Sequence, residues 1–180
     1  MTMKPNLRKL VRTAHVIFAV GWLGAVAAFL ALAIVGLTSE DTQMVRAAYL
    51  AMDLIARFVI VPLSLAPLLL TGPLLSLATP WGLFRHYWII VKLVITILST
   101  LILLVHMQPI SYMSRVAADG TLSSADRGLQ IQLVVAASAG LLALLAATAL
   151  AVYKPRGMTR YGWRKQYEQP TVPPAVDAET

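Results

Sequence analysis

Five ionisable side chains lie inside long apolar stretches of this 180-residue sequence, and chemistry is most readily expected at them. They are two histidines, a lysine and an aspartate–arginine pair: His15, His106, Lys92, Asp53 and Arg57. Because an ionisable group is costly to bury in a membrane, each one marks a candidate site. Imidazole nitrogens, and an amine that burial has deprotonated, can bind metal ions or haem iron.

His15 and Lys92 are expected at the same depth. His15 follows Arg12 by one helical turn, and Lys92 follows Trp88 by one turn. Each should therefore lie roughly 5–10 Å below the same membrane surface, given the helical rise per residue. Haem requires axial ligands on facing helices, an apolar aromatic slot and cations for its propionates. The pattern predicts a haem b site with His15 and Lys92 as iron ligands and with four further contacts: Arg12, Trp22, Arg85 and Trp88. The alternatives are a lysine that extends to the interface and a structural histidine.

A second group of candidates is expected near the opposite surface. His106, Met107 and Met113 combine imidazole and thioether ligands, which suit Cu(I), and Asp53 enters the membrane from the same side. This group predicts an alternative copper site. Each member also has a simpler interpretation: Asp53 and Arg57 are four residues apart and can neutralise each other, and His106 can be an interfacial residue.

The elements that must position these residues are four apolar segments. Hydrophobic residues make up 58% of the chain and charged residues 13%, a balance that a soluble domain of this length would not need. A bilayer core of about 30 Å takes about 20 helical residues. We therefore expect an all-α integral membrane four-helix bundle in residues 1–165, with spans at about 10–37, 46–78, 85–108 and 128–153. The proline-rich, acidic residues 166–180 are expected to form a disordered cytoplasmic tail.

The net charge of +7 is interpreted as membrane topology. Ten of the 15 Lys and Arg residues flank the side of the bundle that carries both termini, and three lie on the other side. The positive-inside rule then places both termini in the cytoplasm of a multi-pass protein of the bacterial cytoplasmic membrane. The lipid bilayer is the expected partner, and nucleic acid is not. With no cysteine, the chain has no disulfide, iron–sulfur cluster or thiol nucleophile.

Local patterns add expectations about the helices themselves. Thr38-x-x-Asp41 and Ser123-x-x-Asp126 predict capping boxes before the second and fourth spans. Residues 109–128 are expected to form a long, partly helical loop. Prolines 62, 67 and 73 predict kinks in the second span. Ala136 and Gly140 predict a close helix–helix approach.

Two of these segments resemble known membrane families. Residues 15–24, His-Val-Ile-Phe-Ala-Val-Gly-Trp-Leu-Gly, are similar to the opening helix of the HemJ-type protoporphyrinogen oxidases and of the CopD-type copper-resistance membrane proteins. Residues 88–94, Trp-Ile-Ile-Val-Lys-Leu-Val, resemble the Trp-x-x-x-Lys stretch of the HemJ helix. The whole chain also resembles an uncharacterised family of bacterial four-helix membrane proteins, notably at residues 79–88 and 153–157. The HemJ resemblance implies b-type haem, with His15 and Lys92 at the positions of that family's functional His and Lys.

Three functions follow from these residues. The first is a haem b membrane protein in electron transfer or porphyrin-linked oxidoreduction, in which case the chain is a haem-dependent enzyme or works with a membrane redox partner. The second is handling of copper or another small solute at the His/Met cluster. The third is a non-catalytic membrane partner, scaffold subunit or homo-oligomer, favoured by the small residues of the helices and the basic tail. The sequence shows no hydrolase triad and no phosphate-binding loop.

Overall fold

The computed structural model describes residues 5–71, 87–153 and 159, and every regular element in these ranges is helical. This confirms the all-helical prediction. The two longest helices are α1 (Pro5–Thr38) and α5 (Tyr87–Ala118), and α6 (Arg127–Tyr153) follows the short 3₁₀ turn η3 (Ser124–Asp126). The second rod is composite: α2 (Thr42–Ile55), the π-helical turn η1 (Ala56–Ile60), α3 (Val61–Leu65) and the π-helical turn η2 (Ala66–Thr71).

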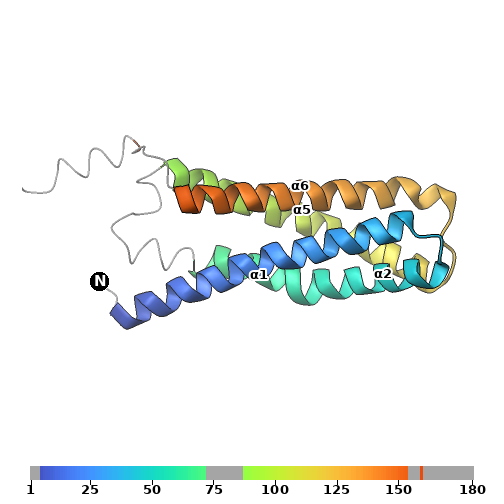
Figure 1. The fold of residues 1–180 in the computed structure, drawn as a ribbon, viewed down its shortest axis with the longest axis horizontal. Helices are drawn as coiled ribbons and strands as arrows, with labels where there is room; N and C mark the ends of the chain where they lie inside the picture. The colour runs from blue at the N-terminus through green and yellow to red at the C-terminus, as the bar shows by residue number, and fades with distance from the viewer. Residues whose placement is uncertain (1–4, 72–86, 154–158, 160–180) are drawn as a thin grey trace, which may run out of the picture.

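The rods lie side by side along one long axis (Figure 1). The α1–α2 and α5–α6 connections lie at one end, which we call the loop end, and the start of α1 and the end of α6 lie at the other, the terminal end. Helix α1 packs against α2 and α6, and α5 also packs against α2 and α6. The four rods therefore form a ring around a shared interior.

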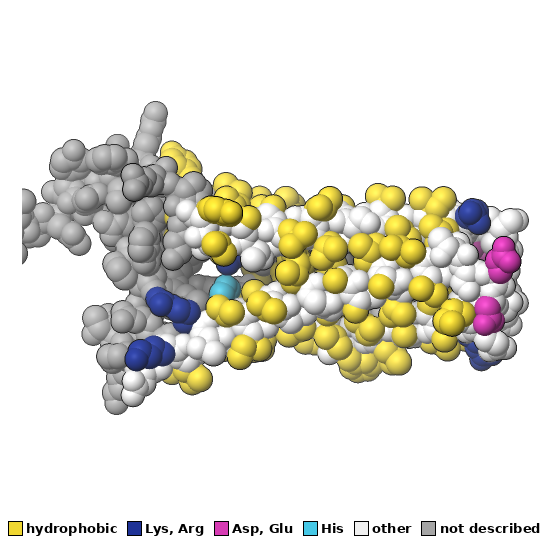
Figure 2. Space-filling model, viewed as in Figure 1, with side chains coloured by type: hydrophobic (Ala, Val, Ile, Leu, Met, Phe, Trp, Pro, Cys, Tyr) yellow, Lys and Arg dark blue, Asp and Glu magenta, His cyan; other side chains and the backbone are white. Residues whose placement is uncertain are grey.

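Four helical stretches are long and apolar enough to cross a membrane. They cover Lys9–Thr38, Thr42–Leu69, Tyr87–Ala118 and Ser124–Tyr153. Large apolar side chains also face outward, including Phe58 and Val105, which are 72% and 71% exposed. Figure 2 shows hydrophobic side chains along the sides of the bundle, whereas Lys, Arg, Asp and Glu gather near its two ends. This distribution is compatible with a multi-pass membrane protein.

Helix α5 extends well past the predicted end of the third span at residue 108. It continues through Pro109 to Ala118, so that the first part of the expected 109–128 loop is helical. A proline within a helix leaves the carbonyl four residues earlier without its usual N–H partner. Packing offsets this cost, because Met113 and Ala117 beyond the proline are only 0% and 2% exposed.

The prolines of the second rod are accompanied by π-helical turns. Pro62 follows η1, and Pro67 lies within η2. The N–H of Val61 donates to the carbonyl of Ala56, five residues earlier, in place of the usual four. A single wide turn of this kind re-satisfies backbone groups near a proline, and it is a recognised cause of kinks. Pro73 lies outside the described residues.

One predicted capping box is confirmed and the other is wrong. The Asp126 carboxylate accepts hydrogen bonds from the Ser123 backbone N–H at 2.9 Å and from its hydroxyl at 3.0 Å. At α2, however, Asp41 is itself the N-cap and accepts from the Gln43 N–H at 2.9 Å. Thr38 ends α1, and its hydroxyl donates to the Ile34 carbonyl. An aspartate immediately before a helix can satisfy a free N–H without a threonine three residues earlier.

Helices α1 and α2 approach closely near the loop end because Gly36 lacks a side chain. Tyr49 is 1% exposed and packs across this glycine. A Cβ atom placed on Gly36 would lie 2.8 Å from the Tyr49 Cζ, closer than real Cβ contacts. The tight small-residue contact of the bundle is thus at Gly36, whereas a Cβ added at Gly24 or Gly140 would meet no atom within 4 Å.

Candidate functional site

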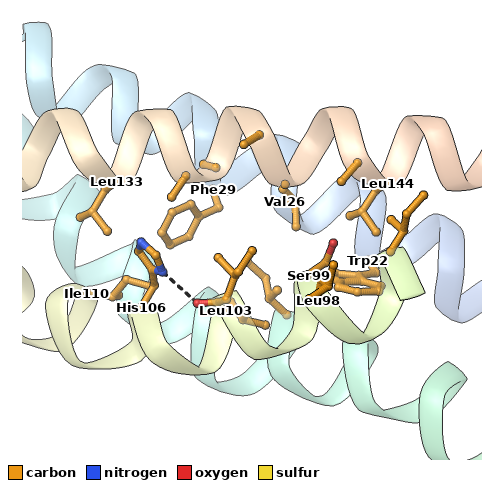
Figure 3. A pocket seen from close by; sticks show the side chains of 18 residues that line it. Trp22, Val26, Phe29, Leu98, Ser99, Leu103, His106, Ile110, Leu133 and Leu144 are labelled. Carbon is orange, nitrogen blue, oxygen red and sulfur yellow. Dashed lines mark hydrogen bonds between the residues drawn. The ribbon is translucent and has the colours of Figure 1, made fainter. Parts of the chain in front are cut away.

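An apolar cavity of about 380 Å³ lies inside the ring between α1, α5 and α6. On α5 its wall extends from Ile95 to Ile110, which corresponds to about 22 Å of helix. Aromatic side chains of α1 form part of the opposite wall, and Figure 3 shows Trp22 and Phe29 at different points along its length. A cavity of this volume is in the range of small-molecule sites, and its length suits an extended ligand.

The space exists because one stripe of α6 carries almost no side-chain volume. The stripe consists of small residues spaced along one helix face: Ala136, Ala139, Gly140 and Ala143. The sequence predicted that Ala136 and Gly140 would bring another helix into close contact. They face the cavity instead, and a Cβ on Gly140 would find open space. Small residues allow either close packing or free volume, and the long side chains of α5 that hold the helices apart decide between them.

His106 supplies the main polar group of this apolar wall. It lies toward one end of the row of side chains in Figure 3, and Trp22 lies toward the other. The His106 Nδ1 is 2.8 Å from the Ile102 carbonyl oxygen, which can only accept a hydrogen bond. In the neutral ring this geometry assigns the proton to Nδ1 and leaves Nε2 as an acceptor.

Gln132 of α6 is exposed beside the polar end of the cavity, where it neighbours His106 without lining the cavity itself. Its Nε2 lies 3.5 Å from the His106 Nε2. The amide side chain can both donate and accept, and the long separation leaves room for a ligand atom to compete for the imidazole nitrogen. Gln132 was not among the site residues predicted from the sequence. Its spacing of four residues from Ala136 and eight from Gly140 places it on the same helix face and was the available signal.

The structure brings His15 and Lys92 near each other. His15 on α1 and Lys92 on α5 are both half-buried, and they are close enough for the lysine charge to act on the imidazole. Trp88 is half-buried one turn before Lys92, and Arg12 is exposed one turn before His15. The other two predicted haem contacts are not found beside His15 and Lys92. Trp22 lines the cavity, and Arg85 lies outside the described residues.

The haem interpretation therefore fits the structure only in part. Two residues that could act as axial ligands lie within the range of a charge effect, but neither His15 nor Lys92 lines the apolar cavity, which begins further toward the loop end. A porphyrin needs its iron ligands and its apolar slot in the same place.

Asp53 and Arg57 form an ion pair, as the simpler interpretation predicted. The Arg57 Nε is 3.0 Å and 2.9 Å from the two carboxylate oxygens of Asp53. Ser111 of α5 joins them: it accepts a hydrogen bond from Arg57, and its hydroxyl lies 2.9 Å from Asp53 and 2.8 Å from the Met107 carbonyl. A hydroxyl has one proton, so the two acceptors share it. Ser111 was missed because one serine on an apolar helix gives little sequence signal.

The copper candidates lie in different surroundings. His106 lines the cavity, Met107 lines a surface groove beside Ser111, and Met113 is 0% exposed in the core. Within the described ranges, no group of three or more His, Cys, Asp or Glu side chains is arranged to hold a metal ion.

No protein-family model, curated protein or solved structure matches this chain.

Proposed function

We propose that this chain is an integral membrane protein of the bacterial cytoplasmic membrane with both termini in the cytoplasm. The four apolar helices and their outward-facing apolar side chains support insertion. The described start of α1 and end of α6 lie at the same end of the bundle (Figure 1). Ten of the 15 Lys and Arg residues lie, in the sequence, before residue 13, between residues 71 and 87 or after residue 153, and this favours the cytoplasmic side for the terminal end.

This orientation would place the polar end of the cavity at the outer edge of the hydrocarbon layer. The uncharged part of α6 extends over residues 128–153, about 39 Å of helix, and so is longer than a bilayer core of about 30 Å. Gln132 lies near the loop-end limit of this stretch, with His106 beside it. A ligand in the cavity would then have its tail within the hydrocarbon layer and its head group at the interface.

The function that the geometry supports best is binding of one elongated lipophilic molecule that carries a hydroxyl head group, such as a quinol with an apolar tail. The observation that carries this proposal is the single imidazole acceptor at the end of a long apolar cavity. A ligand hydroxyl would donate to the His106 Nε2, and its oxygen would accept from the Gln132 amide. The apolar walls would take the tail.

A hydroquinone with a decyl chain is a suitable probe. The full chain, purified in detergent, should bind it with a stoichiometry near one in isothermal titration calorimetry. The variant His106→Phe keeps a large ring but removes the acceptor, so its affinity should fall about tenfold, the effect of one hydrogen bond. Gln108→Ala is a matched control, because Gln108 is exposed on α5 and does not line the cavity. Equal affinities for wild type and His106→Phe would refute the proposed role of the imidazole.

Haem binding at the terminal end is a second candidate, favoured by the proximity of His15 and Lys92. Bound haem b would supply one-electron redox chemistry, and the chain would contribute imidazole and amine ligands. The test is an absorption spectrum of the purified protein. Haem ligation by His15 predicts a Soret band that His15→Ala removes and His106→Phe leaves in place. A colourless preparation from cells supplied with haem precursor would contradict this candidate without affecting the cavity proposal.

A further inference from the structure

A groove of about 760 Å³ crosses the outer face of α5 near the loop end, separate from the cavity. Two arginines line it, Arg57 from η1 and Arg115 from α5, together with Gln108, Ser111 and Tyr112. We call this surface the arginine groove. Arg57 was predicted either as part of a site or as the partner of Asp53, and Arg115 was not among the predicted site residues.

The arginine groove has hydrogen-bond donors to offer. A guanidinium carries five N–H groups. The bonds of Arg57 to Asp53 and Ser111 use its Nε–H and one N–H of Nη2, and its side chain is still 48% exposed. Its remaining N–H groups have no hydrogen-bond partner among the described residues, and the side chain lines the groove. The Asp53 and Ser111 contacts hold the guanidinium in place, which reduces the entropy lost when a ligand binds.

The charge balance of the arginine groove favours an anion. Asp53 compensates one of the two arginines, which leaves one positive charge at the groove. Two further carboxylates lie nearby along the chain, and neither lines the groove. Asp119 follows Arg115 by four residues without an ion pair to it, and Asp126 is 8% exposed and accepts hydrogen bonds from Ser123 and, at 3.3 Å, from the Tyr112 hydroxyl. The groove therefore matches a monoanion with several acceptor oxygens, and a phosphodiester has this chemistry.

An apolar track leads away from the arginine groove toward the terminal end. Leu101, Leu104 and Val105 are exposed on α5, and their spacing places them on the same helix face as Gln108 and Tyr112. A free phosphate would not use this track, but the acyl chains of a phospholipid would lie along it. We propose that the arginine groove binds the phosphate of an anionic phospholipid whose chains follow this face of α5.

The full chain is inserted into vesicles that contain equal amounts of phosphatidylglycerol and phosphatidylcholine and is then released from them. Native mass spectrometry measures which of the two lipids stays bound to the protein. Phosphatidylcholine carries an extra cation that would face the arginines, so wild type should retain phosphatidylglycerol in preference. Arg115→Gln should reduce the preference about fivefold, the effect of one basic residue at a membrane surface. Arg46→Gln is the matched control, because Arg46 is exposed on α2 and does not line the groove.

Three results would overturn the inference: no preference in wild type, an unchanged preference in Arg115→Gln, or an equal loss in Arg46→Gln, which would indicate general surface charge. Displacement of the lipid by millimolar inorganic phosphate would show that the groove recognises free phosphate. The inference rests on the proposed membrane location but not on the cavity ligand. A chain absent from the membrane fraction would contradict the proposed membrane location, whereas loss of lipid preference in an inserted chain would contradict only the phospholipid inference.

Discussion

The loop end and the middle of the bundle are built in opposite ways. At the loop end, polar side chains from different elements are paired: Arg57 and Ser111 with Asp53, and Tyr112 with Asp126. Close packing accompanies the pairing, as in the contact of Tyr49 with Gly36. In the middle, polar groups are few, one face of α6 is nearly bare, and about 380 Å³ is open.

This difference indicates separate roles for the two regions. Hydrogen bonds and tight contacts between helices define how the rods are aligned and maintain that alignment. Open volume does not stabilise a fold, because the lining atoms lose packing partners. A cavity held open between well-aligned helices is the arrangement expected where a ligand supplies the missing contacts.

The largest expected difference between the two regions is in side-chain truncation. Met113→Ala removes a fully buried side chain at the loop end and should lower the free energy of unfolding by about 3 kcal/mol. Leu103→Ala truncates a half-buried cavity wall and should cost about 1 kcal/mol, because its neighbours are already loosely packed. Denaturant titration in a mild detergent measures both. Similar losses would mean that the middle is packed as tightly as the loop end.

Adding a methyl group should also change the stability of the two regions differently. Gly36→Ala forces a Cβ against the Tyr49 ring and should destabilise the chain by about 1–3 kcal/mol. Gly140→Ala adds a methyl group to open space on the cavity wall and should be neutral or stabilise the chain by up to about 1 kcal/mol, through helix propensity. Thermal unfolding of the two variants side by side gives the comparison. If Gly36→Ala were as stable as wild type, the close α1–α2 contact would not exist.

The smallest effect is expected for a single hydroxyl. Ser111→Ala removes the link between α5 and the Asp53–Arg57 pair and should cost about 0.5–1.5 kcal/mol. Ser138→Ala is the control, because the Ser138 hydroxyl bonds only to the Val134 carbonyl of its own helix at 2.8 Å. Hydrogen exchange of the α5 amides near Ser111 would report the local loosening. Identical exchange in both variants would argue against a role of Ser111 in aligning the helices.

The sequence was sufficient for the helical class, for the four apolar segments and for the Asp53–Arg57 pair, because all three depend on composition or on spacing within one helix. It was insufficient for the extent of α5, since local propensity at Pro109 opposes a helix that tertiary packing of Met113 maintains. It also could not distinguish close packing from free volume at Gly140. That outcome depends on residues of other helices, and so does the Ser111 contact with Asp53.

The most direct test of the proposal that the cavity binds a lipophilic ligand is to fill the cavity and measure ligand binding. Gly140→Leu adds a side chain into open space on the cavity wall, whereas Gly24→Leu adds the same side chain at an exposed position of α1 outside the cavity. Titration of both variants with the decyl hydroquinone should show binding to Gly24→Leu as to wild type and no binding to Gly140→Leu, with both proteins folded. Undiminished binding to a folded Gly140→Leu variant would contradict the claim that this cavity is the ligand site.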